Sequence, residues 1–145
     1  MTGSGFARLE PGDIHDLWRA LVDAKLPSDD LTEPDRAFFR LEGEASAEAF
    51  VGLEGTGDDR LLRSLVVLPD RRGAGVGLTV LTLVEEEARR SGVRRLHLLT
   101  TTAAGFFRAN GYVDADRGAA PPMIASSREF TALCPALATY LVKVL

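Results

Sequence analysis

A glycine-rich turn between an apolar run and an amphipathic helix constrains this chain most. The apolar run ends at Pro69, residues 71–77 have the sequence RRGAGVG, and a helical pattern follows. Glycines let backbone N–H groups approach an anion closely, and the positive end of a helix dipole favours negative charge there. The order strand, glycine-rich turn, helix therefore predicts a site for a phosphorylated ligand.

Hydrophobic periodicity predicts a mixture of strands and helices in the rest of the chain. Apolar residues recur at helical spacing from Ile14 to Val22, and the helix after the glycine-rich turn is expected to end at Ser91-Gly92. Residues 61–68 are apolar on both faces, which is typical of a central buried strand. Residues 31–35 fit a loop or a short helix. Further strands are expected at 6–9, 37–41, 47–54, 95–100 and 139–144 and from Tyr112 onward. A short helix is expected at 103–109, and a short turn or helix at 121–127. This order implies an α/β (α+β) class, with one mixed sheet and helices packed on it.

Length, charge and cysteine content exclude several classes of protein. The 145 residues predict one domain spanning 1–145. A net charge of −4 gives no overall attraction for nucleic acid or anionic membranes, and no apolar run is long enough to span a bilayer. The single Cys134 forms no internal disulfide and is expected to be a small buried hydrophobic residue, and the N-terminus lacks signal-peptide features. We therefore expect a cytoplasmic protein without nucleic-acid or membrane partners and without a metal site.

Three phosphate-binding motifs compete for the glycine-rich turn. A P-loop needs a lysine after its last glycine, where this chain has Leu78, and a dinucleotide fingerprint needs G-x-G-x-x-G, where this chain has G-x-G-x-G. Residues 67–77, VLPDRRGAGVG, instead resemble the acetyl-CoA signature V-x-P-x-x-R-G-x-G-x-G of the GNAT N-acetyltransferase superfamily. Residues 104–112, AGFFRANGY, are similar to the family's second landmark, a short helix that ends in Asn-Gly-Tyr.

The resemblance covers nearly the whole chain and implies a mixed central sheet of six or seven strands flanked by about four helices. A narrower resemblance is carried by residues 62–65, 98–103 and 128–135, which are similar to the subfamily known as arsenic resistance N-acetyltransferases. That name is a poor guide to the substrate.

The same resemblance implies acetyl-CoA as the cofactor and assigns its site. The backbone of residues 65–67 would pair with the pantetheine arm, and the N–H of Val66 or Val67 would hold the developing oxyanion. The strands on either side would have to splay apart to admit the arm. The pyrophosphate would lie on the glycine-rich turn, with added positive charge from its two arginines. The expected cofactor-binding residues are Leu65, Val66, Val67, Arg71, Arg72, Gly73, Ala74, Gly75, Val76, Gly77 and Phe107.

The catalytic groups are less well determined. Glu54, at the end of a predicted strand, is the candidate general base, ahead of Glu42 in a predicted hairpin turn. Many family members have a tyrosine as general acid where this chain has Phe107. The proton donor is then Tyr112, Tyr140 or water, or the thiolate leaves unaided, as a thiol pKa near 8.5 allows. We take Glu54 and Tyr112 as the catalytic pair.

Four residues are candidates for binding the acceptor: Arg63, Ser64, Thr100 and Arg128. Arg63 would receive a substrate anion, or else form an ion pair with Glu54; Arg128 would bind an acidic group, or else form a surface ion pair. His97 is expected to be structural rather than a general base.

Together these features predict an acetyl-CoA-dependent N-acetyltransferase. Its acceptor would be the amine of a small molecule, amino-acid-like and associated with arsenic resistance. The alternative is a non-catalytic acetyl-CoA-binding sensor or regulatory module. The oligomeric state is left open, with a homodimer as one alternative.

Overall fold

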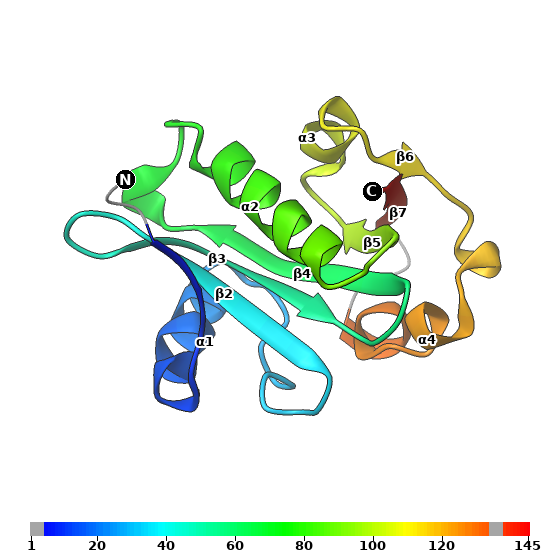
Figure 1. The fold of residues 1–145 in the computed structure, drawn as a ribbon, viewed down its shortest axis with the longest axis horizontal. Coiled ribbons are helices and arrows are strands. Elements are labelled where there is room, and N and C mark those ends of the chain that lie inside the picture. Colours follow the sequence, from blue (N-terminus) through cyan, green and yellow to red (C-terminus); the bar gives the residue numbers. More distant parts are fainter. Residues whose placement is uncertain (1–4, 134–137) are drawn as a thin grey trace.

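The computed structural model describes residues 5–133 and 138–145 and shows one seven-stranded sheet. The strand order is β1-β2-β3-β4-β5-β7-β6, and every neighbouring pair is antiparallel except β4 and β5, which are parallel (Figure 1). The strands are β1 (Gly5–Arg8), β2 (Arg36–Glu42), β3 (Ala47–Glu54), β4 (Asp59–Val67), β5 (Arg95–Thr100), β6 (Val113–Asp114) and β7 (Thr139–Val144). The predicted mixed sheet and its α/β class are confirmed.

Helices cover both faces of this sheet. Helix α1 lies on one face and α2 on the other, with α3 on the same side as α2 (Figure 1). The helices are α1 (Ile14–Asp23), α2 (Val76–Arg90), α3 (Ala104–Ala109) and α4 (Pro122–Ala125), with short 3-10 turns at Pro11–Asp13, Pro69–Arg71 and Arg117–Ala119 and a π-helical turn at Glu129–Leu133. Residues 31–35 form a loop. Within the described residues, no helix has the length and apolar character that crossing a bilayer requires.

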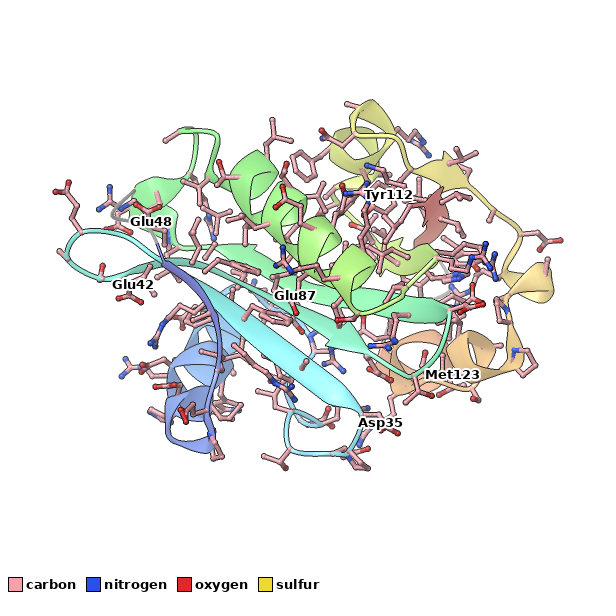
Figure 2. The ribbon with its side chains drawn as sticks, in the orientation of Figure 1. Asp35, Glu42, Glu48, Glu87, Tyr112 and Met123 are labelled. Atoms are coloured by element: carbon pink, nitrogen blue, oxygen red, sulfur yellow. The ribbon has the colours of Figure 1, made fainter. Side chains whose placement is uncertain are left out.

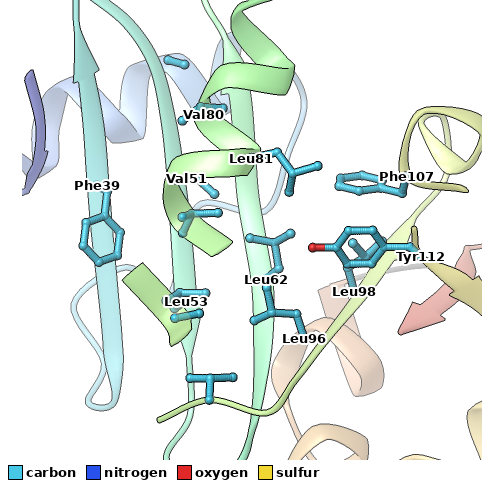
Figure 3. Packing of buried hydrophobic residues seen from close by; sticks show 14 of the residues in the cluster. Phe39, Val51, Leu53, Leu62, Val80, Leu81, Leu96, Leu98, Phe107 and Tyr112 are labelled. Atoms are coloured by element: carbon cyan, nitrogen blue, oxygen red, sulfur yellow. The ribbon is translucent and has the colours of Figure 1, made fainter. Parts of the chain in front are cut away.

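Strand β4 contributes to every apolar cluster of the core. Leu62 packs in the largest cluster, against the buried stripe of α2 that includes Val80 and Val84 (Figure 3). Val66 packs with α1 on the other face, and Leu61 packs with α4. This arrangement explains why residues 61–68 are apolar on both faces, because each face of the strand is buried under a different helix.

A bulge interrupts β4 at Ser64. Phe50 of β3 lies opposite Val66, and Gly52 lies opposite Arg63, so β4 has one residue more than β3 over this stretch. Ser64 has a φ of +59°, a left-handed conformation that a non-glycine residue adopts at a cost. The bulge bends β4 at the point where its central segment turns away from β5.

Strands β4 and β5 pair only at one end. The register joins residues 59–61 to residues 95–97, and no pairs follow although both strands continue. The backbone of β4 beyond Leu61 therefore faces a gap within the sheet. The splaying that the resemblance implied is present, and it starts just before the bulge.

Candidate active site

A cavity of about 380 Å³ occupies the gap between β4 and β5. Its walls come from residues 62–67 of β4, from residues 98–103 at the end of β5, and from the loop at 24–27 after α1. The side of α3 that carries Phe106 and Phe107 completes the lining together with Arg72 and Glu129. Segments far apart in the sequence thus meet at the unpaired edge of one strand.

The direction of the β4 backbone can be derived at Val67. Leu68 N–H donates to Glu48 C=O in β3 at 2.9 Å, so alternation directs the N–H of Val66 toward β3 and both polar groups of Val67 into the gap. The Val67 carbonyl accepts a hydrogen bond from Arg72 Nε at 3.1 Å, which agrees with this direction. Of the two N–H groups considered for the oxyanion, the geometry favours Val67.

The glycine-rich turn has the shape of an anion site. Gly73 and Gly75 have φ values of +83° and +79°, and Gly75 is the N-cap residue of α2. No side chain caps this helix, so the N–H groups of its first turn are available to a ligand. A Cβ added to either glycine would meet nothing within 4 Å, so the space above both is open. The turn therefore fits the pyrophosphate of a coenzyme.

The two arginines of the turn lie at its edges. Arg72 contacts the Val67 carbonyl, and Arg71 Nε lies 3.6 Å from Glu48 Oε2 at the start of β3. Figure 2 shows Glu48 at this end of the sheet. Both arginines directly precede Gly73 in the sequence of the turn.

Phe107 occupies the position at which the resemblance implies a tyrosine in many family members. Its side chain lines the cavity and is buried, and its ring meets that of Tyr112 edge to face at 5.3 Å. The expected contact of Phe107 with a ligand in the gap is therefore compatible with its place, but it offers no proton.

The structure argues against Tyr112 as the proton donor. Its hydroxyl donates to Glu85 Oε2 at 2.8 Å, its ring is buried among apolar side chains, and it is not part of the cavity lining (Figures 2 and 3). Burial raises the Tyr112 pKa far above its usual range, and the Glu85 carboxylate raises it further. Tyr140, the other tyrosine considered, bonds His97 Nδ1 at 2.7 Å.

His97 is a structural histidine, as predicted. Its Nε2 bonds Asp59 Oδ1 at 2.7 Å while Nδ1 bonds the Tyr140 hydroxyl, so both ring nitrogens have partners. The side chain is almost fully buried at the end where β4 and β5 pair. His97 therefore connects β5 to β4 through Asp59 and takes no part in the cavity.

Arg63 does not have the role of an anion receptor. Its Nη1 and Nη2 each lie 2.7 Å from an oxygen of Asp30, Nη1 also donates to Glu54 at 2.9 Å, and Nε donates to Ser64 Oγ at 3.1 Å. Every guanidinium nitrogen is therefore occupied, so a substrate carboxylate would have to displace a buried acid. The alternative, an ion pair with Glu54, is the one that the structure has.

This cluster also argues against Glu54 as the general base. Its carboxylate lies between Arg63 and Arg36, the latter at 3.5 Å, and it does not line the cavity. A base must be within hydrogen-bond reach of the proton that it abstracts. Glu54 instead helps to hold the end of β3 against the bulge of β4.

The remaining acceptor candidates divide into two groups. Ser64 and Thr100 line the cavity beside residues 65–67. Arg128 lies outside it and pairs at the surface with Glu33 at 2.6 Å and Asp29 at 3.0 Å.

Cys134 lies outside the described residues. Among those that are described, no cluster of three or more His, Cys, Asp or Glu side chains is placed to hold a metal ion.

Sequence reasoning assigned no site role to two of the charged residues that line the cavity. Glu129 is buried, lines the cavity and lies 4.0 Å from Arg63 Nη2. Lys25 is exposed and lines the cavity from the loop after α1. Lys25 belongs to no motif, and Glu129 lies within residues 128–135, which carry the subfamily resemblance without assigning this residue a role.

Comparison with known families identifies the domain. Residues 34–114, from β2 to β6, match the model of the acetyltransferase (GNAT) domain. The chain belongs to the GNAT acetyltransferase family. As a GNAT acetyltransferase it uses acetyl-CoA, and the open glycine turn and the unpaired edge of β4 fit that donor. No curated protein matches this acetyltransferase significantly.

Solved structures share the fold of this GNAT domain at low sequence identity. N-acetylglutamate synthase from Neisseria gonorrhoeae, complexed with coenzyme A and N-acetyl-glutamate, has a TM-score of 0.80 and 21% identity over 100% of this chain. The present chain spans 36% of that protein's length. Rv2747 from Mycobacterium tuberculosis, in complex with CoA and NLQ, has a TM-score of 0.78 and 17% identity over 97% of this chain and 99% of its own.

Another GNAT acetyltransferase, from Staphylococcus aureus, gives a TM-score of 0.76 at 15% identity and covers 99% of both chains. At these identities the similarity establishes the fold alone. The assignment of acceptor-binding residues must therefore rest on the cavity of this chain.

Proposed function

We propose that residues 1–145 act as one acetyltransferase domain that acetylates the amine of a small, amino-acid-like molecule. The observation that carries this proposal is the unpaired edge of β4, which lies beside a cavity and runs directly into an open glycine-rich helix start. Family membership favours catalysis over the alternative of a non-catalytic sensor.

The proposed donor site follows the β4 edge into the start of α2. Bound acetyl-CoA supplies an activated acetyl thioester. The N–H groups of residues 72–77 would hold its pyrophosphate, and Arg71 and Arg72 would add positive charge. The edge at residues 65–67 would align the pantetheine arm, with Phe107 packing beside it. The Val67 N–H would stabilise negative charge as it develops on the reacting carbonyl oxygen.

The acceptor would enter on the side of Ser64, Thr100 and Glu129. Its amine must be neutral to attack, and Glu129 is the carboxylate on the described cavity wall that would accept the proton. In the transfer the C–N bond forms, the C–S bond breaks, and the departing thiolate takes up a proton from water. No tyrosine of the described cavity lining supplies that proton.

Three finer proposals remain: an arsenic-resistance role, a cytoplasmic location and a homodimer. The subfamily resemblance of residues 62–65, 98–103 and 128–135 supports the first, and the single cysteine supports the second. Growth of an arsenic-sensitive host with and without the gene would test the first proposal. Cell fractionation would test the second, and light scattering the third.

The direct test of the proposed function combines binding with turnover. Calorimetry should show that coenzyme A binds the folded protein, and a thiol reagent should show that acetyl-CoA releases thiol faster when an amine acceptor is present. Absence of coenzyme A binding would contradict the donor site. Binding without acceptor-dependent thiol release would contradict the transferase.

Replacing Phe107 with tyrosine tests the missing acid. The new hydroxyl would lie at the cavity wall, so we expect kcat to rise by about tenfold, since general acid catalysis commonly contributes more than this. Coenzyme A affinity should stay within a few-fold. Phe106→Tyr, one residue away on the same wall, is the matched control and should leave kcat unchanged. An unchanged kcat for Phe107→Tyr would contradict the need for an acid at this position.

A further inference from the structure

Ser64 is the residue at which the cavity wall meets the buried ion cluster. Its side chain is half-buried and lines the cavity from β4. Its neighbour Arg63 is held by Asp30 and Glu54, and Arg63 Nε donates to Ser64 Oγ at 3.1 Å. The hydroxyl oxygen is therefore attached to a fully buried cation while the residue itself faces the cavity.

This contact decides what the Ser64 hydroxyl can do. A guanidinium only donates hydrogen bonds, so Ser64 Oγ is the acceptor and Arg63 cannot receive the hydroxyl proton. Among the described residues no acceptor bonds that proton, so it is available to a ligand in the cavity. A hydrogen bond received from a charged donor also polarises the O–H bond and makes it a stronger donor. Ser64 therefore acts as a hydrogen-bond donor to the cavity and not as a base.

The backbone of Ser64 is consistent with a functional role. Its φ of +59° at the bulge is a strained conformation for a serine. Such strain persists where the surroundings hold it in place, and it is concentrated at ligand sites. Here the restraint comes from Arg63, whose two terminal nitrogens bond the buried Asp30 at 2.7 Å each. Arg63 is thus a positioning residue for the Ser64 hydroxyl.

The position of Ser64 along β4 indicates which molecule it meets. The proposed donor site runs from the glycine-rich turn along residues 65–67, with the Val67 N–H at the reacting carbonyl. Ser64 lies three residues further from the turn, roughly 10 Å along an extended strand, and so on the acceptor side of that carbonyl. On the opposite wall, Thr100 Oγ1 accepts from the Ala103 N–H at 3.0 Å. Both hydroxyl oxygens are therefore partnered, and both walls offer hydroxyl protons to oxygen atoms of a ligand.

We propose that the Ser64 hydroxyl donates to a carboxylate or carbonyl oxygen of the acceptor, and that Ser64 thereby selects amino-acid-like acceptors over simple alkylamines. Arg63 determines the direction in which the hydroxyl donates. This inference rests on the proposed function and assigns its acceptor specificity to a residue of the bulge.

The first experiment compares acceptors that differ in this oxygen. Phenylalanine, leucine and arginine are each supplied as the L-amino acid, as its amide and as the decarboxylated amine, so that a carboxylate and a neutral carbonyl are tested separately. Thiol release from acetyl-CoA measures turnover, and calorimetric titration into protein saturated with coenzyme A measures binding. In at least one series, the acid or the amide should exceed the amine about tenfold or more in both measurements.

Ser64→Gly removes the hydroxyl and allows the backbone to keep its left-handed conformation. It should raise the KM for the preferred oxygen-bearing acceptor about tenfold or more with little change in kcat, and should leave the KM for the decarboxylated amine within about twofold. The matched control is Asp35→Gly. Asp35 has a φ of +62° and lies outside the cavity lining, so this variant relieves similar strain without removing a cavity hydroxyl and should change neither KM.

Arg63→Lys tests the positioning role, because lysine keeps the charge of the cluster but not the planar geometry of the guanidinium. It should raise the same KM as Ser64→Gly, and combining the two variants should raise that KM no further, since both remove one contact. Additive effects would refute the positioning role of Arg63. The result for Ser64→Gly decides the role of the hydroxyl even if Arg63→Lys fails to fold.

The outcomes separate this inference from the function on which it rests. Preference for the decarboxylated amines would overturn the assignment of Ser64 while the acetyltransferase stands, and so would a Ser64→Gly effect that is absent or equal for all three acceptors of a series. Failure of every acceptor to release thiol from acetyl-CoA bound to the wild type would overturn the proposed function and this inference with it.

Discussion

Gly75→Val should weaken coenzyme A binding by at least about 100-fold, measured by calorimetry. The glycine has a φ of +79°, and a side chain there would project into the open space where the pyrophosphate is proposed to lie. A β-branched residue also disfavours this conformation, so the N–H groups of the first turn of α2 would be displaced. Both effects act on the same few backbone atoms.

The matched control for this variant is Gly92→Val at the other end of α2. Gly92 has a φ of +85°, and an added Cβ would also meet nothing within 4 Å. The two variants should therefore lose similar stability, about 1–2 kcal/mol, while only the first loses coenzyme A. Equal affinities in the two folded proteins would refute the assignment of the turn.

Arg63→Met should lower the free energy of unfolding by about 3–5 kcal/mol, because removing one partner leaves buried acids without their cation. The Arg63 and Asp30 side chains are both fully buried. Chemical denaturation would measure this change, and the melting temperature should fall by about 10 °C. The matched control is Arg95→Met, which removes an exposed arginine that also contacts an aspartate through two nitrogens and should cost little.

The stability lost in Arg63→Met should also depend on pH. Burial acts to raise the Asp30 pKa, but the hydrogen bonds and charges of Arg63 and Arg36 outweigh it and lower the pKa from 3.8 to about 2. A lowered folded-state pKa stabilises the fold above pH 4 and loses that contribution as the pH falls from about 4 toward 2. The difference in the free energy of unfolding between the wild type and Arg63→Met should therefore become smaller in acid. A difference that does not change with pH would contradict the role of the Arg63–Asp30 pair.

Most of the fold could be predicted because it is encoded locally. The alternation and composition of residues 47–54, 95–100 and 139–144 gave strand bounds that the structure reproduces, and the glycines around α2 marked both of its ends. The apolar character of β4 on both faces predicted its central place. These features depend on neighbours within a few positions, which a sequence shows directly.

The site was harder to predict because its side chains depend on contacts between distant segments. Arg63 was recognised as important, but its main partner, Asp30, lies 33 positions earlier in a loop with no periodic pattern. By sequence Tyr112 is a candidate proton donor because Phe107 has no hydroxyl, but the fold directs the Tyr112 hydroxyl to Glu85. Glu129 lies in the cavity only because the π-helical turn packs beside β4. The Ser64 bulge has no sequence signal of its own.

The short contact between β4 and β5 has a mechanical consequence. Three backbone residue pairs join the half-sheet of β1–β4 to that of β5, β7 and β6, and the side-chain contacts of Asp59 with Arg95 and His97 lie at the same end. A molecule bound along the open edge of β4 would contact both half-sheets and hold them together. The resistance of the enzyme to heat and to proteases should therefore increase with the concentration of its own acyl donor, because a ligand that binds the folded state stabilises it.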